Sequence, residues 1–304
     1  MSSELTKRTL FAVVAAPAAI AIVLYGGAPL AALLAITAAL GAWEFFRIAR
    51  ASGLTPMEDI GIAIGALIPL GVFARYLGIY DPNARHAPSV ASILVIVTVA
   101  LLGAAIWRRG VEGKPLGAAA STLFGIVYTG GTLSYAFAIR QHEYAFAPSE
   151  WRIGGWAIPS GGFLLLLPLL TTWASDIGAY AVGRLFGKRK LIPAVSPGKT
   201  VEGAIGGVVA SMIVSWAFVQ FVLAPATHLG FSWRPFGAAF FGALISVAAQ
   251  IGDLAESLLK REARVKDSST LIPGHGGILD RCDSLLFVLP VCYVALGWLL
   301  TVVP

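Results

Sequence analysis

Long apolar runs separated by short polar connections dominate the 304-residue chain. A helix of about 20 residues crosses the hydrocarbon core of a bilayer, because each residue adds about 1.5 Å along the helix axis. The apolar runs that come close to this length are 9–25, 28–47, 58–78, 90–107, 116–138, 162–184, 202–224, 235–259 and 284–303. The pattern predicts an all-α integral membrane protein with about nine transmembrane helices.

The first apolar run allows a second interpretation. Lys7 and Arg8 precede it and it contains small residues, as a secretory signal peptide would. The run is long and another follows almost at once, so we favour a retained helix. The longest polar connections are 139–161, 185–201 and 260–283, and none of them has the length of a soluble domain.

Composition and charge agree with a membrane protein. Charged residues make up 12% of the chain, against about 25% in soluble domains. The formal net charge of +6 could suggest a nucleic-acid partner. However, with the N-terminus placed in the cytoplasm, 17 of the 22 Lys and Arg residues fall on the cytoplasmic side. The basic surplus therefore predicts a cytoplasmic N-terminus and an external C-terminus, and no nucleic acid.

The two cysteines do not suggest a disulfide. Cys282 and Cys292 are the cysteines of the chain. If the segment between them is helical, its rise separates them by about 15 Å, which is too far for a bond.

Asp176 lies inside the apolar run 162–184, about eight residues before its cytoplasmic end. A carboxylate at such depth costs a few kcal/mol and normally faces a partner or a water-filled cavity. It could pair with Arg184 or Lys188 and hold two helices together. We favour a functional role.

The stretch "SPGKT", residues 196–200, ends like a phosphate-binding P-loop. The P-loop pattern needs a glycine where this chain has Pro193, and we expect no strand before it, so we reject that motif. Lys199 nevertheless stands just before a predicted helix start. A lysine beside free backbone N–H groups at a helix N-terminus suits a polyphosphate.

Asp253, Glu256 and Ser257 share one face of the predicted helix 235–259. Glu256 has Lys260 four residues later and could pair with it. Asp253 has no such cation on its own helix, so a metal ion or a residue from another helix must supply the positive charge.

The connection before the last apolar run is rich in glycine and charge, in the sequence "KDSSTLIPGHGGILDRCDS", residues 266–284. Its glycines leave backbone N–H groups open to a ligand, and Asp280 and Asp283 stand one helical turn apart. Helix capping would explain one of these aspartates but not both. Hard oxygen ligands near lysines and glycines predict a Mg²⁺-assisted phosphate site rather than a plain solvated loop.

Residues 257–283, "SLLKREARVKDSSTLIPGHGGILDRCD", resemble the signature of the phosphatidate cytidylyltransferases, or CDP-diacylglycerol synthases. "DIGAYAVGRLFGK" and "SPGKTVEG" also resemble segments of this family, so the resemblance covers about 170–285. The N-terminal third is similar only in hydropathy and in "WEFFRI", residues 43–48. Gly198 departs from the family, which usually has a lysine there. The matching signature residues are Ser257, Lys260, Arg261, Lys266, Asp267, Pro273, His275, Gly276, Gly277, Asp280, Arg281 and Asp283.

The resemblance implies a reaction in which CTP and phosphatidate give CDP-diacylglycerol and pyrophosphate. It implies that Asp253 and Asp280 bind Mg²⁺, with a second cation left open, and that Lys260 and Asp283 take part in catalysis. Lys199 and Lys260 would hold phosphate oxygens. The further substrate-binding residues that we expect are Asp176, Ser196, Arg261, Lys266, His275, Gly276, Gly277 and Arg281.

We expect residues 1–160 to form a scaffold for lipid access or homodimer contacts, and residues 161–304 to form the catalytic region. A prokaryotic plasma membrane, with the active site on its cytoplasmic face, fits this layout. Two alternatives stay open. An ion-coupled transporter also needs intramembrane acids, but it usually shows repeated broken helices, which we do not find. A CTP-dependent lipid-alcohol kinase would need a base for the hydroxyl group.

Overall fold

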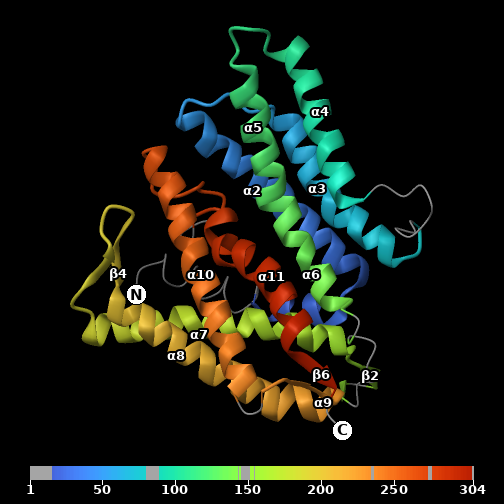
Figure 1. The fold of residues 1–304 in the computed structure, drawn as a ribbon, viewed down its shortest axis with the longest axis vertical. Coiled ribbons are helices and arrows are strands. Elements are labelled where there is room, and N and C mark those ends of the chain that lie inside the picture. The colour runs from blue at the N-terminus through green and yellow to red at the C-terminus, as the bar shows by residue number, and fades with distance from the viewer. Residues whose placement is uncertain are drawn as a thin grey trace. The chain divides into compact units, whose positions relative to one another are not determined.

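The computed structural model describes residues 16–79, 89–142, 144, 151–153, 155–233, 236–272 and 276–302. These residues pack as two compact units, each built from several parts of the chain (Figure 1). The first unit contains the residues up to Gly26, Tyr135–Leu258 and the residues from Cys282 onward. The second unit contains Gly27–Ser134 and Leu259–Arg281. The expected functional division at residue 160 concerns catalysis and stays a prediction.

The helices confirm the predicted class. In the described residues, eight helices are long and apolar enough to cross a membrane, and a shorter apolar helix spans Ala16–Tyr25. The long ones are α2 (Gly27–Ala51), α3 (Glu58–Tyr76), α4 (Val90–Arg108), Pro115–Arg140, α7 (Ser160–Phe186), Val201–Thr227, α10 (Phe236–Glu262) and α11 (Leu279–Leu299).

Two of the long helices contain a π-helical turn. Pro115–Arg140 consists of α5 (Pro115–Ile126), η1 (Val127–Gly131) and α6 (Thr132–Arg140). Val201–Thr227 consists of α8 (Val201–Phe218), η3 (Val219–Leu223) and α9 (Ala224–Thr227). The last helix begins at Leu279 rather than at 284, so Asp280 and Asp283 lie in its first turns. Its predicted end at 303 was wrong, because the chain leaves the helix after Leu299.

Three short antiparallel hairpins interrupt the helices. β1 (Arg152–Ile153) pairs with β2 (Trp156–Ala157), β3 (Lys190–Ile192) with β4 (Ser196–Thr200), and β5 (Leu229–Phe231) with β6 (Leu300–Val302). The expectation that no strand precedes "SPGKT" was wrong, since this stretch is itself β4 and follows β3. The strand runs directly into α8 without a glycine-rich loop, so the rejection of a P-loop stands.

Glycines bring α7 and α8 into close contact in the first unit, where the two helices lie side by side (Figure 1). A Cβ on Gly203 would lie 2.8 Å from the carbonyl oxygen of Ala179, and one on Gly207 would lie 2.8 Å from that of Ser175. Any larger residue would push the helices apart. The Ser175 hydroxyl in turn lies 2.6 Å from that of Ser246 on α10. Helices α7, α8 and α10 thus form one packed group.

The second unit has a core of its own. Met57, Leu101, Ala105, Ala119 and Ile126 form a buried apolar cluster from the entry to α3, α4 and α5. The backbone N–H of Met57 donates to the hydroxyl of Thr122 at 2.8 Å, which satisfies a donor before the first turn of α3. This arrangement fixes α3 against α5.

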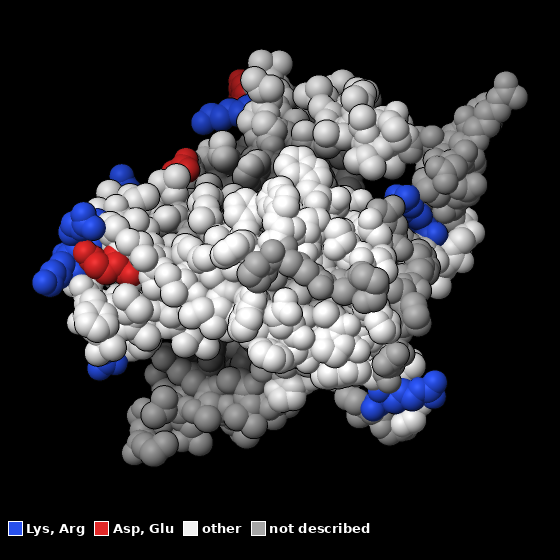
Figure 2. Space-filling model, turned by 60° about the horizontal axis from the view of Figure 1, so that its bottom comes forward, with Lys and Arg blue, Asp and Glu red and all other residues white. Residues whose placement is uncertain are grey.

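Exposed side chains on the long helices are largely apolar. Ile96 on α4, Ile213 on α8 and Trp298 on α11 are examples, each more than half exposed. The face turned to the viewer in Figure 2 carries little charge, and the Lys, Arg, Asp and Glu side chains in view lie toward its margins. Apolar surface of this kind suits contact with lipid. Together with the helices it makes the protein a multi-pass membrane protein.

The charge pattern predicts the orientation of the chain, which labelling can test. In a variant without Cys282 and Cys292, a cysteine introduced at position 188 should react with a membrane-impermeant reagent only from the cytoplasmic side. A cysteine at position 304 should react only from outside, because the positive-inside rule places these positions on opposite faces. Labelling of both positions from one face would contradict the predicted topology.

Candidate active site

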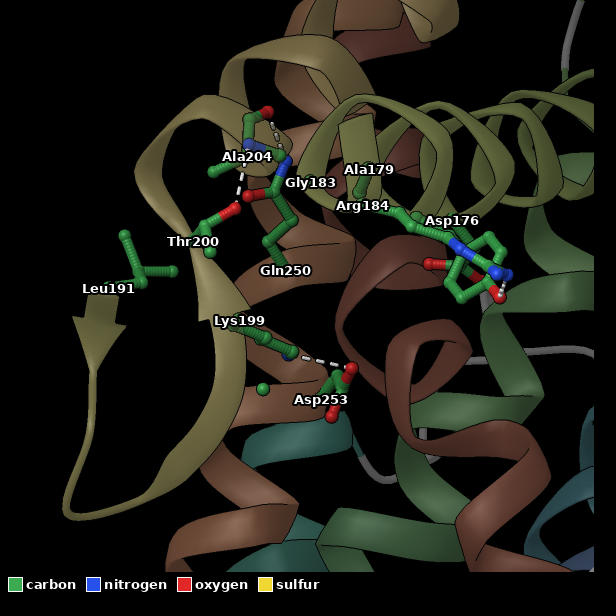
Figure 3. A pocket seen from close by; sticks show the side chains of 13 residues that line it. Asp176, Ala179, Gly183, Arg184, Leu191, Lys199, Thr200, Ala204, Gln250 and Asp253 are labelled. Atoms are coloured by element: carbon green, nitrogen blue, oxygen red, sulfur yellow. Dashed lines mark hydrogen bonds and ion pairs between the residues drawn. The ribbon is translucent and has the colours of Figure 1, made fainter. Parts of the chain in front are cut away.

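A cavity of about 530 Å³ opens in the first unit, where α7, the β3–β4 hairpin, α8 and α10 meet (Figure 3). Its volume lies in the usual range for small-ligand sites. Its lining combines charged side chains with several glycines and alanines. The lining residues are Asp176, Ala179, Tyr180, Gly183, Arg184, Leu191, Gly198, Lys199, Thr200, Gly203, Ala204, Gln250 and Asp253.

The hairpin that carries Lys199 is fastened to the start of α8. The Thr200 side chain accepts a hydrogen bond from the N–H of Gly203 at 3.1 Å and so caps the helix. The Glu202 carboxylate accepts from the backbone N–H groups of Lys188 and Arg189 at 3.0 and 3.1 Å. The hairpin is therefore held at both of its ends, which fixes the strand position of Lys199.

The caps also correct one expectation. We expected free N–H groups beside Lys199 to bind a polyphosphate. Instead the N–H of Val201 donates to the carbonyl of Arg189, and that of Gly203 donates to Thr200. Both groups are occupied within the fold, because the hairpin folds back onto the helix start. These two groups are therefore not free to donate to a phosphate.

Lys199 and Asp253 form an ion pair across the cavity. The Lys199 Nζ lies 2.6 Å from an Asp253 oxygen, and Figure 3 shows the two side chains pointing toward each other. The side chains are 26% and 37% exposed, so both remain accessible to a ligand. The Ser257 hydroxyl lies 3.4 Å from the other Asp253 oxygen, as their shared helix face predicts. The sequence led us to expect either a metal ion or a residue from another helix beside Asp253. The structure places a lysine there, and this lysine comes from strand β4.

Asp176 lies in the same cavity and forms no ion pair among the described residues. Arg184, one of its expected partners, instead donates a hydrogen bond to the hydroxyl of Tyr180 at 2.9 Å. The charges of Asp283, Asp253 and Lys199 act on Asp176. Within the first unit, the carboxylates of Asp176, Asp253 and Asp283 are thus brought into one electrostatic neighbourhood with Lys199.

Gly198 lines the cavity beside Lys199. A Cβ built at this position would have no heavy atom within 4 Å. The packing therefore does not require glycine here, and a larger side chain would extend into open space.

A second polar cluster lies in the second unit, where Lys260 and Asp280 form a buried ion pair. The Lys260 Nζ lies 2.6 Å from Asp280 Oδ1, and the side chains are only 12% and 9% exposed. Asp280 Oδ2 accepts hydrogen bonds from the N–H groups of Ser268 and Gly277 at 3.0 and 2.8 Å, and the Ser268 hydroxyl oxygen lies 2.9 Å from it. Asp280 therefore ties the two ends of its own loop together.

These two ion pairs correct an argument made from the sequence. The resemblance implies that Asp253 and Asp280 both bind Mg²⁺, and Asp253 has no cation on its own helix. In the structure each of these aspartates has a lysine at 2.6 Å. Asp253 belongs to the first unit and Asp280 to the second. A shared ion stays a prediction.

Packing within the connection before α11 explains why Gly276 and Gly277 are glycines. Gly276 has a φ of +80°, a backbone conformation that disfavours residues with a Cβ. A Cβ on Gly277 would lie 2.1 Å from the hydroxyl oxygen of Ser268 and 2.4 Å from an oxygen of Glu44. Both glycines are needed for the loop itself, and phosphate binding by them stays a prediction.

Sequence reasoning missed Glu44, which α2 places at the centre of this cluster. Its side chain is 0% exposed and accepts hydrogen bonds from the hydroxyls of Ser268 and Ser269 and from the N–H groups of Ile278 and Leu279. A signal was available, because a carboxylate inside the apolar run 28–47 usually marks a functional or structural polar site.

The remaining predicted residues lie in several surroundings. Ser196 is half-buried at the start of β4 and does not line the cavity. Arg261, Lys266 and Arg281 are exposed, and Asp283 is half-buried in α11. His275 lies outside the described residues.

Comparison with known proteins extends the similarity beyond the signature. A model of the cytidylyltransferase family matches residues 6–299. A phosphatidate cytidylyltransferase of Synechocystis is 31% identical over 308 aligned positions, which cover 98% of this chain and 98% of the relative. One of Haemophilus influenzae is 34% identical over 295 positions, with 94% and 96% covered, and one of Bacillus subtilis is 46% identical over 125 positions, with 41% and 44% covered. The N-terminal helices are thus included in the similarity.

Proposed function

Because the chain belongs to the cytidylyltransferase family, we propose that it transfers CMP from CTP to phosphatidate and releases pyrophosphate. The relatives that match nearly its whole length are phosphatidate cytidylyltransferases. The observation on the molecule that carries the proposal is the Lys199–Asp253 pair, which puts a cation and a carboxylate in a cavity of about 530 Å³. A nucleotide with several phosphates is a ligand that such a site suits.

The reaction needs little proton chemistry. An oxygen of the phosphatidate phosphate attacks the α-phosphorus of CTP, and the bond from this phosphorus to the oxygen of the leaving pyrophosphate breaks. The second pKa of a phosphate monoester is about 6, so the attacking group is already largely an anion at neutral pH. The protein has to reduce the repulsion between anions and align them. A general base is therefore not required of His275.

In this reaction Lys199 would bind phosphate oxygens of CTP. It is half-buried and stands on a strand that is fixed at both ends, so its position is set before the nucleotide arrives. Its partner Asp253 is the carboxylate that would hold a cation in this cavity. Lys260 is held by Asp280 inside its own unit, so we assign it to the support of the signature loop.

We propose Mg²⁺ as the cofactor, with Asp253 as a ligand. The donor chemistry fits, because the carboxylates of Asp176, Asp253 and Asp283 are hard oxygen ligands that share one electrostatic neighbourhood. Among the described residues, no three His, Cys, Asp or Glu side chains are already arranged around a common point for a metal. When bound, the ion would offset phosphate charge in the transition state. Asp280 as second ligand, and a second cation, stay predictions.

Lys199→Ala should raise the KM for CTP or lower kcat by a few tens-fold, since a hydrogen bond to a charged group contributes about 1.5–3 kcal/mol. The dependence on phosphatidate should change less. Lys188→Ala is the matched control, because this exposed lysine lies in the same connection but outside the cavity lining. Steady-state kinetics with each substrate varied in turn measure both effects. If Lys199→Ala keeps wild-type CTP kinetics, Lys199 does not bind CTP. It would then contribute only to the positive charge of the cytoplasmic side.

The proposed activity is tested with purified protein in detergent micelles, phosphatidate, Mg²⁺ and CTP labelled in the cytidine. A lipid-soluble labelled product is expected, and it should be absent without phosphatidate. If the label stays in water under all conditions, the protein is not a phosphatidate cytidylyltransferase. We further propose that the enzyme works in a prokaryotic plasma membrane with its cavity on the cytoplasmic side, where CTP is available. Homodimer formation stays a prediction.

A further inference from the structure

Glu44, on α2 in the second unit, is a fully buried acid whose two carboxylate oxygens both accept hydrogen bonds. Its side chain is 0% exposed, and a buried carboxylate is strongly destabilising unless its oxygens accept hydrogen bonds. Oε1 accepts from the Ser269 hydroxyl at 2.5 Å and from the Ile278 N–H at 3.0 Å. Oε2 accepts from the Ser268 hydroxyl at 2.9 Å and from the Leu279 N–H at 2.6 Å.

These four donors come from the two ends of one segment. Ser268 and Ser269 stand at its beginning, and Ile278 and Leu279 stand where it enters α11. One carboxylate thus clamps the beginning of the segment to its end. Each oxygen binds one hydroxyl and one backbone N–H, so both oxygens must be acceptors for the clamp to be complete.

The clamp is linked directly to Asp280. The Ser268 hydroxyl oxygen lies 2.9 Å from Glu44 Oε2 and 2.9 Å from Asp280 Oδ2, so the two carboxylates share its single proton. Asp280 in turn accepts from Gly277 N–H and pairs with Lys260. The backbone at Gly277 lies so close to Glu44 that a Cβ would approach its oxygen to 2.4 Å. A change at Glu44 would therefore reach Asp280 through both Ser268 and the backbone.

We propose that Glu44 is a positioning residue for cytidylyl transfer: it holds Ser268 and Ser269 against Ile278 and Leu279, and thereby fixes the orientation of Asp280 and Lys260. The inference rests on the proposed function, but it assigns a role to the N-terminal part of the chain that the signature alone does not. Glu44 acts through the segment and does not contact substrate. Holding these four residues in place reduces the reorganisation that the reaction would otherwise require.

Glu44→Gln is the informative variant because it keeps the size of the side chain. The amide has one acceptor oxygen and one NH₂ donor. In either amide orientation, one of the two backbone N–H groups, Ile278 or Leu279, faces the NH₂ and loses its acceptor. We expect a folded protein whose segment is loosened at one end. Glu58→Gln is the matched control, since Glu58 is in the same unit but forms a partly exposed ion pair with Arg50 at 2.9 Å.

Two measurements are combined. Hydrogen exchange followed by mass spectrometry should show faster exchange in peptides that contain Ile278 and Leu279 in Glu44→Gln, and unchanged exchange in Glu58→Gln. Per molecule of folded enzyme, kcat should fall at least about 10-fold in Glu44→Gln while the KM for CTP changes less than about threefold, as for a loss felt in the transition state. Ser268→Ala, which removes the hydroxyl link alone, should lower kcat in the same direction.

Faster exchange with an unchanged kcat per folded molecule would overturn the positioning role and leave Glu44 as a stabilising residue only. Unchanged exchange would show that Glu44 does not hold the segment, and this too would overturn the proposal. The wild-type enzyme is assayed first, so a failure of the proposed function is recognised separately: no lipid-linked cytidine would then form in any variant, whereas the exchange result would still be readable.

Discussion

Asp253→Asn should lower cytidylyl transfer by at least about 100-fold while leaving a folded, membrane-inserted protein. The substitution keeps the shape of the side chain and removes the charge that would hold Mg²⁺ beside the phosphates, and loss of groups that support a metal costs about 10–100-fold or more. Folding should survive, because the Lys199–Asp253 pair is partly exposed, with side chains 26% and 37% accessible, and such pairs contribute little to stability. Initial rates over a range of Mg²⁺ concentrations measure the effect.

Asp59→Asn serves as the control for this variant. Asp59 pairs with Arg108 in the second unit and its side chain is 65% exposed, so the same substitution there should leave the rate unchanged. If Asp253→Asn keeps near-wild-type activity, or if chelation by EDTA leaves the wild-type rate unchanged, a metal role for Asp253 is wrong. Asp253 would then be the structural partner of Lys199.

The double variant Asp253→Asn/Asp280→Asn tests the shared ion that the sequence predicts. Ligands of one ion act as a unit, so the double variant should lose little more activity than either single variant. Losses that multiply would assign the two aspartates to separate tasks, which the two lysine partners also allow.

Asp280→Asn should lower both activity and stability, which separates it from Asp253→Asn. The Lys260–Asp280 pair is nearly buried, and removal of one partner leaves a buried charge uncompensated, at a cost of about 3–5 kcal/mol. Thermal unfolding in detergent, followed together with the rate, measures the two effects.

Lys260→Met/Asp280→Asn distinguishes the stability effect from the catalytic one. Without the lysine no buried charge is left alone, so most of the lost stability should return. The activity should stay low, because the carboxylate that contacts Ser268 and Gly277 is still missing. A double variant as unstable as Asp280→Asn would show that the hydrogen bonds of Asp280 with Ser268 and Gly277, and not the ion pair, hold this part of the protein.

The long helices could be predicted because a bilayer demands about 20 apolar residues in succession, a signal that each run carries by itself. The β3–β4 hairpin could not, since "KLI" and "SPGKT" are short and lack an alternating apolar pattern. The start of α11 at Leu279 could not be predicted either, because it precedes the apolar run and Asp280 in its first turn accepts hydrogen bonds from Ser268 and Gly277.

Partners distant in sequence were the main limit at the site. The spacing rules along one helix rightly placed Asp253 beside Ser257, but they say nothing of Lys199, which reaches Asp253 from a hairpin on another part of the chain. Glu44 lies 224 residues before Ser268, and only the fold brings them together. The glycines of the signature were assigned to phosphate binding, although the positive φ of Gly276 and the contact of Gly277 with Glu44 already explain them.

The central claim is that CMP, and not a terminal phosphate, passes from CTP to phosphatidate. Two parallel assays with the wild-type protein, one with CTP labelled at the α-phosphorus and one with CTP labelled at the γ-phosphorus, test it directly. We predict that the α-label appears in the lipid extract and that the γ-label appears in water-soluble pyrophosphate. Transfer of the γ-label to lipid would instead identify a CTP-dependent lipid kinase and contradict the account.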